Sequence, residues 1–319
     1  MAMYRDGLPQ MGGQPFLTDS GLETTLVFRE NIPLPHFASI VLVDRPDGIE
    51  LLQRYFYSHV ELAHAHGMGI VLESTTWRAS ADWGRKLGYT PAALIKANSS
   101  SIKLIEQVRA MFPMGSPPIV ISGNMGPRGD GYQAHAKMTV EEAMRYHQTQ
   151  ADCLAHTNAD MLAAFTLNYV EEAIGIVRAA QRARMPIAIS FTLETDGRLP
   201  SGMMLGDAIE RTDAMTDGYP LYYMINCAHP SHFAELFHEP AEWHQRLRGL
   251  RANASKRSHA ELDNSPNLDI GDPNELGEDY RMLCEMLPQL NIFGGCCGTD
   301  LRHVAAIAAA LKPGMALVS

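Results

Sequence analysis

Three cysteines are the residues of this chain best suited to chemistry. Cys296 and Cys297 are adjacent and lie between Gly294-Gly295 and Gly298, and Cys227 ends an apolar run. Three thiolates can bind one Zn²⁺ tetrahedrally and leave a fourth position open, which is the pattern of a catalytic zinc rather than a structural one. Adjacent cysteines can share an ion only if the backbone turns sharply between them, and the glycines supply that freedom. The three cysteines are therefore a candidate metal site.

Other interpretations of these cysteines remain open at this point. They could be ordinary core residues, because cysteine is often buried, and a redox pair of Cys296 with Cys297 would be strained. A second ligand set would combine Cys227 with His229 and His232. Both histidines lie past the end of the apolar run, where they could instead cap a helix or face solvent.

The other cysteines and a group of histidines fall within helical patterns. Cys153 and Cys284 are predicted to pack in the core. His59, His64 and His66 are predicted to lie on the solvated face of one helix. The chain has five cysteines, an odd number with two adjacent, which argues against a disulfide framework.

Apolar runs alternate with helical patterns along the chain. The predicted strands cover residues 15–21, 68–75, 119–124, 160–166, 186–193, 221–227, 250–253 and 291–293, and the predicted helices cover 47–66, 91–111, 139–156, 170–184, 205–215, 233–247, 275–287 and 301–307. Most of the strands are continuous apolar runs, as expected where both faces of a parallel sheet are buried.

Eight strand–helix units predict an α/β protein with a (β/α)₈ TIM barrel, and a doubly wound sheet is the main rival. We expect residues 1–319 to form one domain, because no linker, repeat or low-complexity segment interrupts the pattern. A polar stretch around 255–273 is predicted to be a long loop on the face that carries the site. Thr139 and Glu142 have the spacing of a helix capping box.

Nearly every predicted strand ends in a polar or reactive residue. In a barrel these strand ends converge on one rim, where active sites lie. Cys227 and the Cys296–Cys297 pair are expected to come from two neighbouring strand ends at this rim. The polar candidates for substrate contacts are Asp19, Glu73, Ser74, Thr75, Asn124 and Asn226.

The composition excludes some partners. The chain has 319 residues, 46% of them apolar, and a formal charge of −10, which argues against nucleic acid or an anionic membrane as a main partner. No apolar stretch approaches the ~18 residues that suggest a membrane span, and the first residues have no apolar signal core. We therefore expect a cytoplasmic protein.

The chain resembles the homocysteine S-methyltransferase family, which includes betaine- and S-methylmethionine-dependent enzymes and the homocysteine module of cobalamin-dependent methionine synthase. The match runs from one end of the sequence to the other. It is carried by segments similar to the family's first-, second- and third-strand motifs and to its zinc motifs, namely 18–24 (Thr-Asp-Ser-Gly-Leu-Glu-Thr), 73–80, 123–127, 226–227 (Asn-Cys) and 294–299 (Gly-Gly-Cys-Cys-Gly-Thr).

The resemblance implies a zinc-dependent thiol S-methyltransferase with a barrel fold. It implies that Cys227, Cys296 and Cys297 ligate Zn²⁺, and that homocysteine is methylated to methionine by a small onium donor. A free thiol of pKa ~8.5 is mostly protonated at neutral pH, so the bound ion would be needed to produce the thiolate. Phe37 and Trp77 could flank the donor through cation–π contacts.

The sequence departs from the family pattern at two informative positions. Phe165 stands where members that use small donors carry a Glu near the substrate amine, so the acceptor could be a different thiol, and Glu73 or Glu194 could replace the missing acid. Arg78 stands where betaine enzymes carry a Tyr, which favours S-methylmethionine or S-adenosylmethionine over betaine.

Further expectations concern cofactors and assembly. The chain ends soon after the barrel, so we expect no cobalamin module. Besides methylation of homocysteine or of a different thiol, a third hypothesis is a barrel that binds zinc but catalyses no reaction. The helices after the sixth and seventh strands could form an oligomer interface, but nothing in the sequence specifies one.

Overall fold

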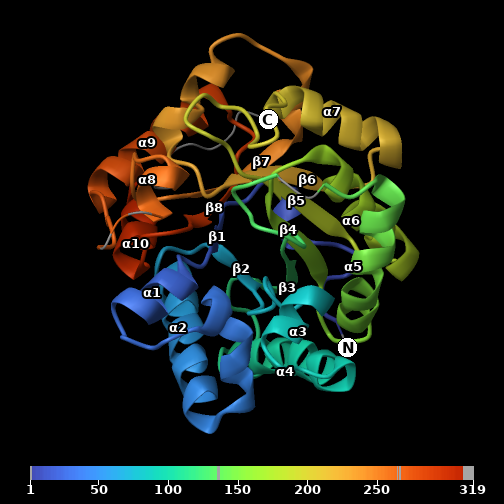
Figure 1. The fold of residues 1–319 in the computed structure, drawn as a ribbon. Coiled ribbons are helices and arrows are strands. Elements are labelled where there is room, and N and C mark those ends of the chain that lie inside the picture. Colours follow the sequence, from blue (N-terminus) through green and yellow to red (C-terminus); the bar gives the residue numbers. More distant parts are fainter. Residues whose placement is uncertain (1, 135–136, 264, 266, 312–319) are drawn as a thin grey trace.

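The computed structural model, which describes residues 2–134, 137–263, 265 and 267–311, contains a closed barrel of parallel strands (Figure 1). Each strand pairs in parallel with the next, and β8 closes on β1. The strands are β1 (Phe16–Thr18), β2 (Gly69–Glu73), β3 (Ile119–Met125), β4 (Met161–Leu167), β5 (Ile187–Phe191), β6 (Tyr222–Asn226), β7 (Leu247–Ala252) and β8 (Ile292–Gly295). The predicted (β/α)₈ barrel is confirmed, and the doubly wound sheet is wrong.

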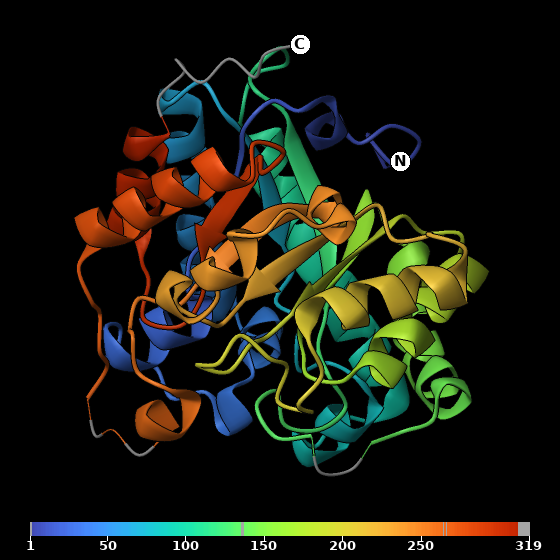
Figure 2. The same cartoon turned by 90° about the horizontal axis from the view of Figure 1, so that it is seen from above.

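Helices surround the strands on the outside of the barrel (Figures 1 and 2). The longer ones are α2 (Pro46–Ala65), α4 (Pro91–Ala110), α5 (Val140–Ala155), α6 (Val170–Ala183), α7 (Leu205–Thr216), α9 (Pro273–Met286) and α10 (Leu301–Ala310). The capping box is confirmed at the start of α5, where the amide of Glu142 donates to Thr139 Oγ1 at 3.2 Å and the amide of Thr139 donates to Glu142 Oε2 at 2.8 Å. Local sequence signals thus set this helix boundary.

The helix predicted over 233–247 is wrong. In its place the chain forms the short 3₁₀ turns Pro230–His232, Ala234–Phe237 and Glu242–Arg246. Pro240 lies within this segment, and proline lacks an amide hydrogen and disfavours helical geometry in the residue before it. The apolar spacing resembled a helix, but the backbone could not continue through the proline.

Two apolar layers fill the space inside and outside the strands. The barrel interior is packed with side chains from alternate strand positions, among them Phe16, Val71, Val120, Met161, Ala163, Ala188, Tyr222, Met224 and Ile292. The intervening strand residues face the helices. Because strand side chains alternate, the inward positions two residues further along β2, β4, β6 and β7 are Glu73, Phe165, Asn226 and Arg251. These four residues therefore reach the carboxyl-terminal mouth of the barrel.

The strand β7 lies between the two strands that carry the cysteines. The amide of Cys227, just after β6, donates to Arg251 O at 3.1 Å, and the amide of Cys296, just after β8, donates to Ala252 O at 2.8 Å. The expectation that the cysteines come from neighbouring strand ends is therefore wrong, because β6 and β8 each pair with β7 and not with each other.

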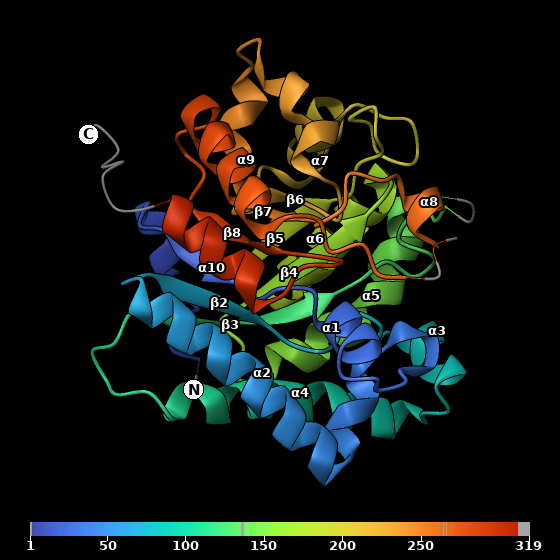
Figure 3. The ribbon, with the colours of Figure 1, turned by 90° about the vertical axis from the view of Figure 1, so that its left-hand side faces the viewer.

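Short helices gather at the mouth of the barrel. Figure 3 shows α1 (Leu22–Phe28), α3 (Ala81–Lys86) and α8 (His259–Asp263) at one end of the molecule, away from the N-terminal segment. The region expected as a long loop, 255–273, contains α8. Among the described residues, no helix is both long and apolar enough to cross a membrane.

Candidate metal centre

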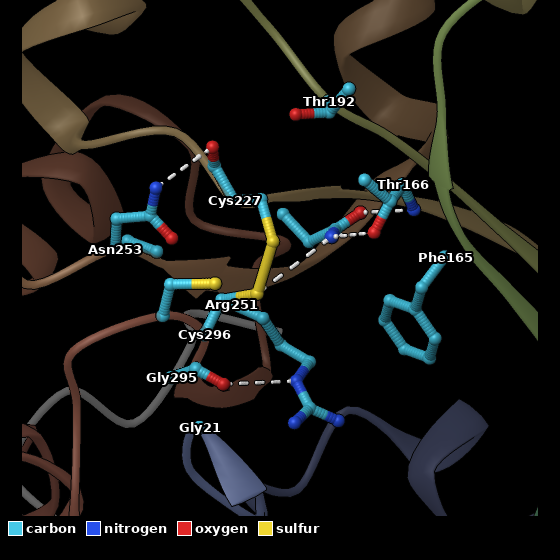
Figure 4. The surroundings of a disulfide bond; sticks show 12 residues. Gly21, Phe165, Thr166, Thr192, Cys227, Arg251, Asn253, Gly295 and Cys296 are labelled. Atoms are coloured by element: carbon cyan, nitrogen blue, oxygen red, sulfur yellow. Dashed lines mark hydrogen bonds between the residues drawn. A yellow bond between two sulfur atoms is a disulfide. The ribbon is translucent and has the colours of Figure 1, made fainter. Parts of the chain in front are cut away.

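The three predicted ligands meet at the mouth of the barrel. The sulfur atoms of Cys227, Cys296 and Cys297 all lie within 4.8 Å of one another. In this structure the sulfurs of Cys227 and Cys296 are joined as a disulfide with a Cα–Cα distance of 5.4 Å (Figure 4). Cys297 is not part of this disulfide and is half-buried. The sulfur–sulfur bond thus links the two strand ends rather than the adjacent cysteines.

The backbone at this site turns sharply, as the glycines suggested. Gly298 has φ +80°, and a Cβ added there would lie 2.6 Å from Asp269 O. Cys227 itself adopts φ 54°, the left-handed conformation that non-glycine residues seldom occupy. Thr299 Oγ1 donates to Cys296 O at 2.7 Å and closes the turn after β8. The peptide geometry, more than side-chain packing, brings the three sulfurs together.

The histidines of the alternative ligand set lie elsewhere. His229 caps the following 3₁₀ turn, since its Nδ1 accepts from the amide of Ser231 at 3.2 Å. His232 Nε2 lies 2.8 Å from Lys256 O. Neither joins the cysteine group, which is the one metal-competent cluster of three or more such side chains found in the described part of the chain. The helix-cap interpretation of His229 is confirmed.

The donor set suits a thiophilic ion once the disulfide is reduced. A tetrahedral zinc with Zn–S bonds of ~2.3 Å requires sulfurs about 3.8 Å apart, and the three sulfurs lie within 4.8 Å of one another. Polar groups approach the sulfurs from outside the set, because Tyr132 Oη lies 3.7 Å from Cys297 Sγ and Asn226 Nδ2 lies 4.0 Å from Cys296 Sγ. Such contacts stabilise thiolates and orient them.

An ion pair that the sequence did not reveal lies beside the sulfurs. Arg251 Nη2 lies 2.7 Å from Asp19 Oδ1, and both side chains are buried. The Arg251 guanidinium carbon also lies 5.0 Å from the centre of the Phe165 ring. Burial raises the pKa of Asp19, and Arg251 opposes that rise. The pair fixes a positive and a negative charge at the floor of the pocket.

Glu73 lines the same pocket, where a hydrogen bond with the Ser122 side chain acts to lower its pKa. Its residue is 4% exposed, and no hydrogen-bond partner of its Oε2 is found within the described ranges. Burial raises the pKa of Glu73 to about 7, and the positive charge of Arg251 opposes the shift. Glu194, the other acid considered as a replacement at the Phe165 position, is not among the residues that line the pocket.

The other predicted substrate residues differ in whether their polar side-chain atoms already have hydrogen-bond partners. The Thr75 hydroxyl is 2.8 Å from Ser101 Oγ on α4, and the Ser74 hydroxyl accepts from the amide of Asn124 at 2.9 Å. The Asn226 Oδ1 accepts from Ser190 Oγ at 2.7 Å and also from the amide of Thr166. Among the described residues no partner of Asn124 Oδ1 is found. The substrate roles of these residues stay predictions.

The aromatic candidates for donor binding line the pocket, but one is partly covered. The Arg78 guanidinium carbon lies 4.7 Å from the centre of the Trp77 ring and 4.3 Å from that of Trp83. A cation of the protein therefore already stacks on Trp77. Phe37 is half-buried at the rim with φ 57°. Donor binding at Phe37 and Trp77 stays a prediction.

Two aromatic rings at the mouth were missed by sequence reasoning. Tyr132 and His259 stack with ring centres 4.2 Å apart, and His259 is brought there by α8 within the expected loop. Burial lowers the pKa of His259 to about 4. No sequence signal could have found this contact, because both residues lie in polar, irregular stretches.

One helical histidine is not where it was expected. His59 is buried rather than solvated, and its Nε2 lies 3.0 Å from Ser20 Oγ, next to Asp19. Burial lowers the pKa of His59 to about 4. The core prediction is confirmed for Cys284, whereas Cys153 is only half-buried.

The mouth of the barrel holds one pocket of about 410 Å³. Residues from the ends of strands around the barrel and from the 255–269 segment line it, including Asp19, Phe37, Glu73, Trp77, Asn124, Phe165, Asn226, Arg251, His259 and the three cysteines. The volume falls within the ~300–1,000 Å³ typical of small-molecule sites.

Comparison with known families decides the relationship. A model of the homocysteine S-methyltransferase family matches residues 16–311. The chain belongs to this family. The match confirms the resemblance that the sequence showed.

Two curated relatives match most of the chain. The chain is 25% identical over 290 residues to methionine synthase of Mycobacterium tuberculosis, which covers 84% of this chain and 22% of that protein. It is 24% identical over 288 residues to methionine synthase of Mycobacterium leprae, covering 84% of this chain and 21% of that protein. The chain thus spans about a fifth of the length of these relatives.

Homocysteine methyltransferase MmuM from Escherichia coli has the same fold. Its oxidized form aligns with a TM-score of 0.71 at 21% identity, covering 93% of this chain and 96% of that one. Its metallated form aligns with a TM-score of 0.70 at 19% identity, covering 94% and 98%. These likenesses show the barrel fold.

Proposed function

We propose that this chain is a zinc-dependent thiol S-methyltransferase that converts homocysteine to methionine with a small sulfonium donor. The observation that carries the proposal is the grouping of three cysteine sulfurs within 4.8 Å at the mouth of a barrel. The existence of a metallated form of the E. coli relative supports it. The family motifs at Cys227 and at Cys296–Cys297 supply the same ligand set.

Cys227, Cys296 and Cys297 would hold the ion in their reduced state. Bound Zn²⁺ would lower the pKa of a thiol substrate so that its sulfur is a thiolate near neutral pH. Cys227 and Cys296 cannot serve as ligands while they are bonded to each other, so metal loading requires a reductant.

The reaction is a direct transfer between two sulfur atoms. The acceptor sulfur loses its proton to solvent and attacks the methyl carbon, and a new carbon–sulfur bond forms. The donor's bond to that carbon breaks, and its electrons remain on the donor sulfur, which becomes a neutral thioether. The residues of the pocket contribute by aligning the two reactants and by excluding water.

The charges and the size of the pocket favour a small cationic donor. Its lining includes Asp130 and Asp269 in addition to the buried acids at its floor, so a positively charged donor is attracted. A volume of about 410 Å³ lies near the lower end of the usual range, which favours the compact S-methylmethionine over the bulkier S-adenosylmethionine. Arg78 covers the Trp77 ring, so the donor would reach the sulfur beside this stack.

Metal content and methyl transfer test the proposal together. The reduced protein should bind one zinc per chain, and Cys297→Ala should lose most of it, whereas Cys153→Ala, which removes a half-buried thiol outside the site, should retain it. Homocysteine and other thiols are then offered with S-methylmethionine, S-adenosylmethionine or betaine. Unchanged zinc in Cys297→Ala would refute the ligand assignment, and the absence of methionine with every donor would refute the reaction.

A further inference from the structure

The Arg251 guanidinium is held in place on two sides beside the sulfurs. Its Nη2 lies 2.7 Å from Asp19 Oδ1, and its Nε donates to Gly295 O at 3.2 Å, directly before Cys296 (Figure 4). The same Nη2 lies 3.3 Å from Ser20 O. The ring of Phe165 packs against the guanidinium at 5.0 Å. These contacts remove most of the freedom that an arginine side chain ordinarily has.

One edge of this guanidinium remains unused. An arginine offers five N–H donors in a rigid fork, and the contacts described involve Nε and Nη2. Within the described residues no partner of Nη1 is found. The Arg251 side chain is 10% exposed and lines the pocket. The N–H groups of Nη1 can donate charge-assisted hydrogen bonds to a carboxylate.

A buried carboxylate oxygen also belongs to the lining of the pocket. Glu73 Oε2 is buried and has no partner found among the described residues. It offers an acceptor for an ammonium group on a substrate whose carboxylate is at Arg251. The pocket therefore presents the Nη1 donors of Arg251 and the Oε2 acceptor of Glu73, which together suit an amino-acid head group.

We propose that Arg251 binds the carboxylate of the thiol acceptor and thereby restricts the enzyme to carboxylate-bearing thiols. This inference rests on the proposed function of the same pocket and specifies the class of acceptor. Phe165 gives the guanidinium an apolar surface to pack on, so a ring at this position is consistent with a positive charge beside it. The position of β7 between the cysteine-bearing strands sets the arginine next to the place where the acceptor sulfur must lie.

Three thiols of equal chain length test the inference by binding alone. Homocysteine carries both an amine and a carboxylate, 4-mercaptobutanoate lacks the amine, and 3-aminopropane-1-thiol lacks the carboxylate. Calorimetric titration of each into the reduced, zinc-loaded full chain, without a methyl donor, gives the three dissociation constants. We expect the aminothiol to bind about 10- to 100-fold more weakly than the two carboxylates, as the loss of one charge-assisted contact predicts. Equal affinity for the three thiols, or tightest binding of the aminothiol, would overturn the inference.

Variants of Arg251 separate substrate binding from a structural role. Arg251→Met should weaken binding of the two carboxylate thiols by about 10- to 100-fold and leave the aminothiol within about 2-fold, with zinc content unchanged. Because this change leaves Asp19 buried without its partner, the double variant Asp19→Asn, Arg251→Met is measured beside it. An equal loss for all three thiols in a folded variant would show a structural role only and would overturn the inference.

The binding measurement keeps this inference independent of the proposed reaction. A wild-type protein that prefers carboxylate thiols but methylates none would retain the Arg251 assignment and refute the methyltransferase. A protein that methylates all three thiols with equal affinity would retain the methyltransferase and refute the role of Arg251.

Discussion

Replacing Glu73 with glutamine should stabilise the fold above neutral pH and should matter little in acid. Glu73 is buried, its Oε2 has no partner found in the described part of the chain, and burial raises its pKa from 4.5 to about 7. The glutamine side chain has nearly the same shape but cannot ionise. The change therefore removes the cost of a buried charge without opening a cavity.

The magnitude follows from the difference between the folded and unfolded pKa values. Burial raises the pKa of Glu73 from 4.5 to about 7, and at ~1.4 kcal/mol for each tenfold change in proton affinity this amounts to about 3 kcal/mol. Because the folded pKa is the higher one, the protonated carboxyl stabilises the fold below pH 4.5, and this contribution is lost as pH rises to about 7. The advantage of Glu73→Gln should grow over this interval and level off above it.

Urea unfolding followed by circular dichroism between pH 4.5 and 8.5 measures this difference. Urea is uncharged and therefore does not screen the ion pair between Arg251 and Asp19. Glu50→Gln, at an exposed position in α2, is the matched control. A Glu73→Gln advantage that stays constant across the range would refute the reasoning, because it would mean that Glu73 does not titrate between the two limits.

Two further predictions concern the barrel itself. Gly294→Ala should destabilise the protein strongly, because the added methyl group would meet Thr18 Oγ1 at the closure of β8 on β1, whereas Gly129→Ala, which meets nothing within 4 Å, should be neutral in thermal denaturation. Asp160→Asn should cost about 3–5 kcal/mol in urea unfolding, because it leaves Arg109 without the buried carboxylate that it contacts at 2.8 Å; a loss below ~1 kcal/mol would contradict the importance of that pair.

Much of the barrel could be predicted from the sequence because its strands are buried on both faces. Such strands appear as continuous apolar runs, and each predicted strand overlaps a strand of the structure. The predicted segment at 250–253 covers only the second half of β7, which spans Leu247–Ala252. Arg248 and Arg251 interrupt its apolar pattern, and a strand with two arginines resembles a surface segment.

The cysteine cluster could be predicted, but most of its surroundings could not. Adjacent cysteines between glycines are a local signal, and the barrel rule brings strand ends together. The pairing of Arg251 with Asp19, by contrast, depends on which side chains of β7 and of the residues after β1 face inward once the barrel is closed. His59 could not be placed either, since a helical histidine gives no sign of whether its face meets solvent or Ser20.

The position of β7 couples the metal centre to the arginine that we assign to substrate binding. The amides of Cys227 and Cys296 both donate to carbonyls of β7, those of Arg251 and Ala252. A displacement of this strand would therefore move two of the three sulfurs together with the guanidinium. Loss of thiol binding with loss of zinc would report a moved strand, whereas loss of thiol binding with zinc retained reports the Arg251 side chain alone. For this reason the zinc content of Arg251→Met decides how its binding data are to be interpreted.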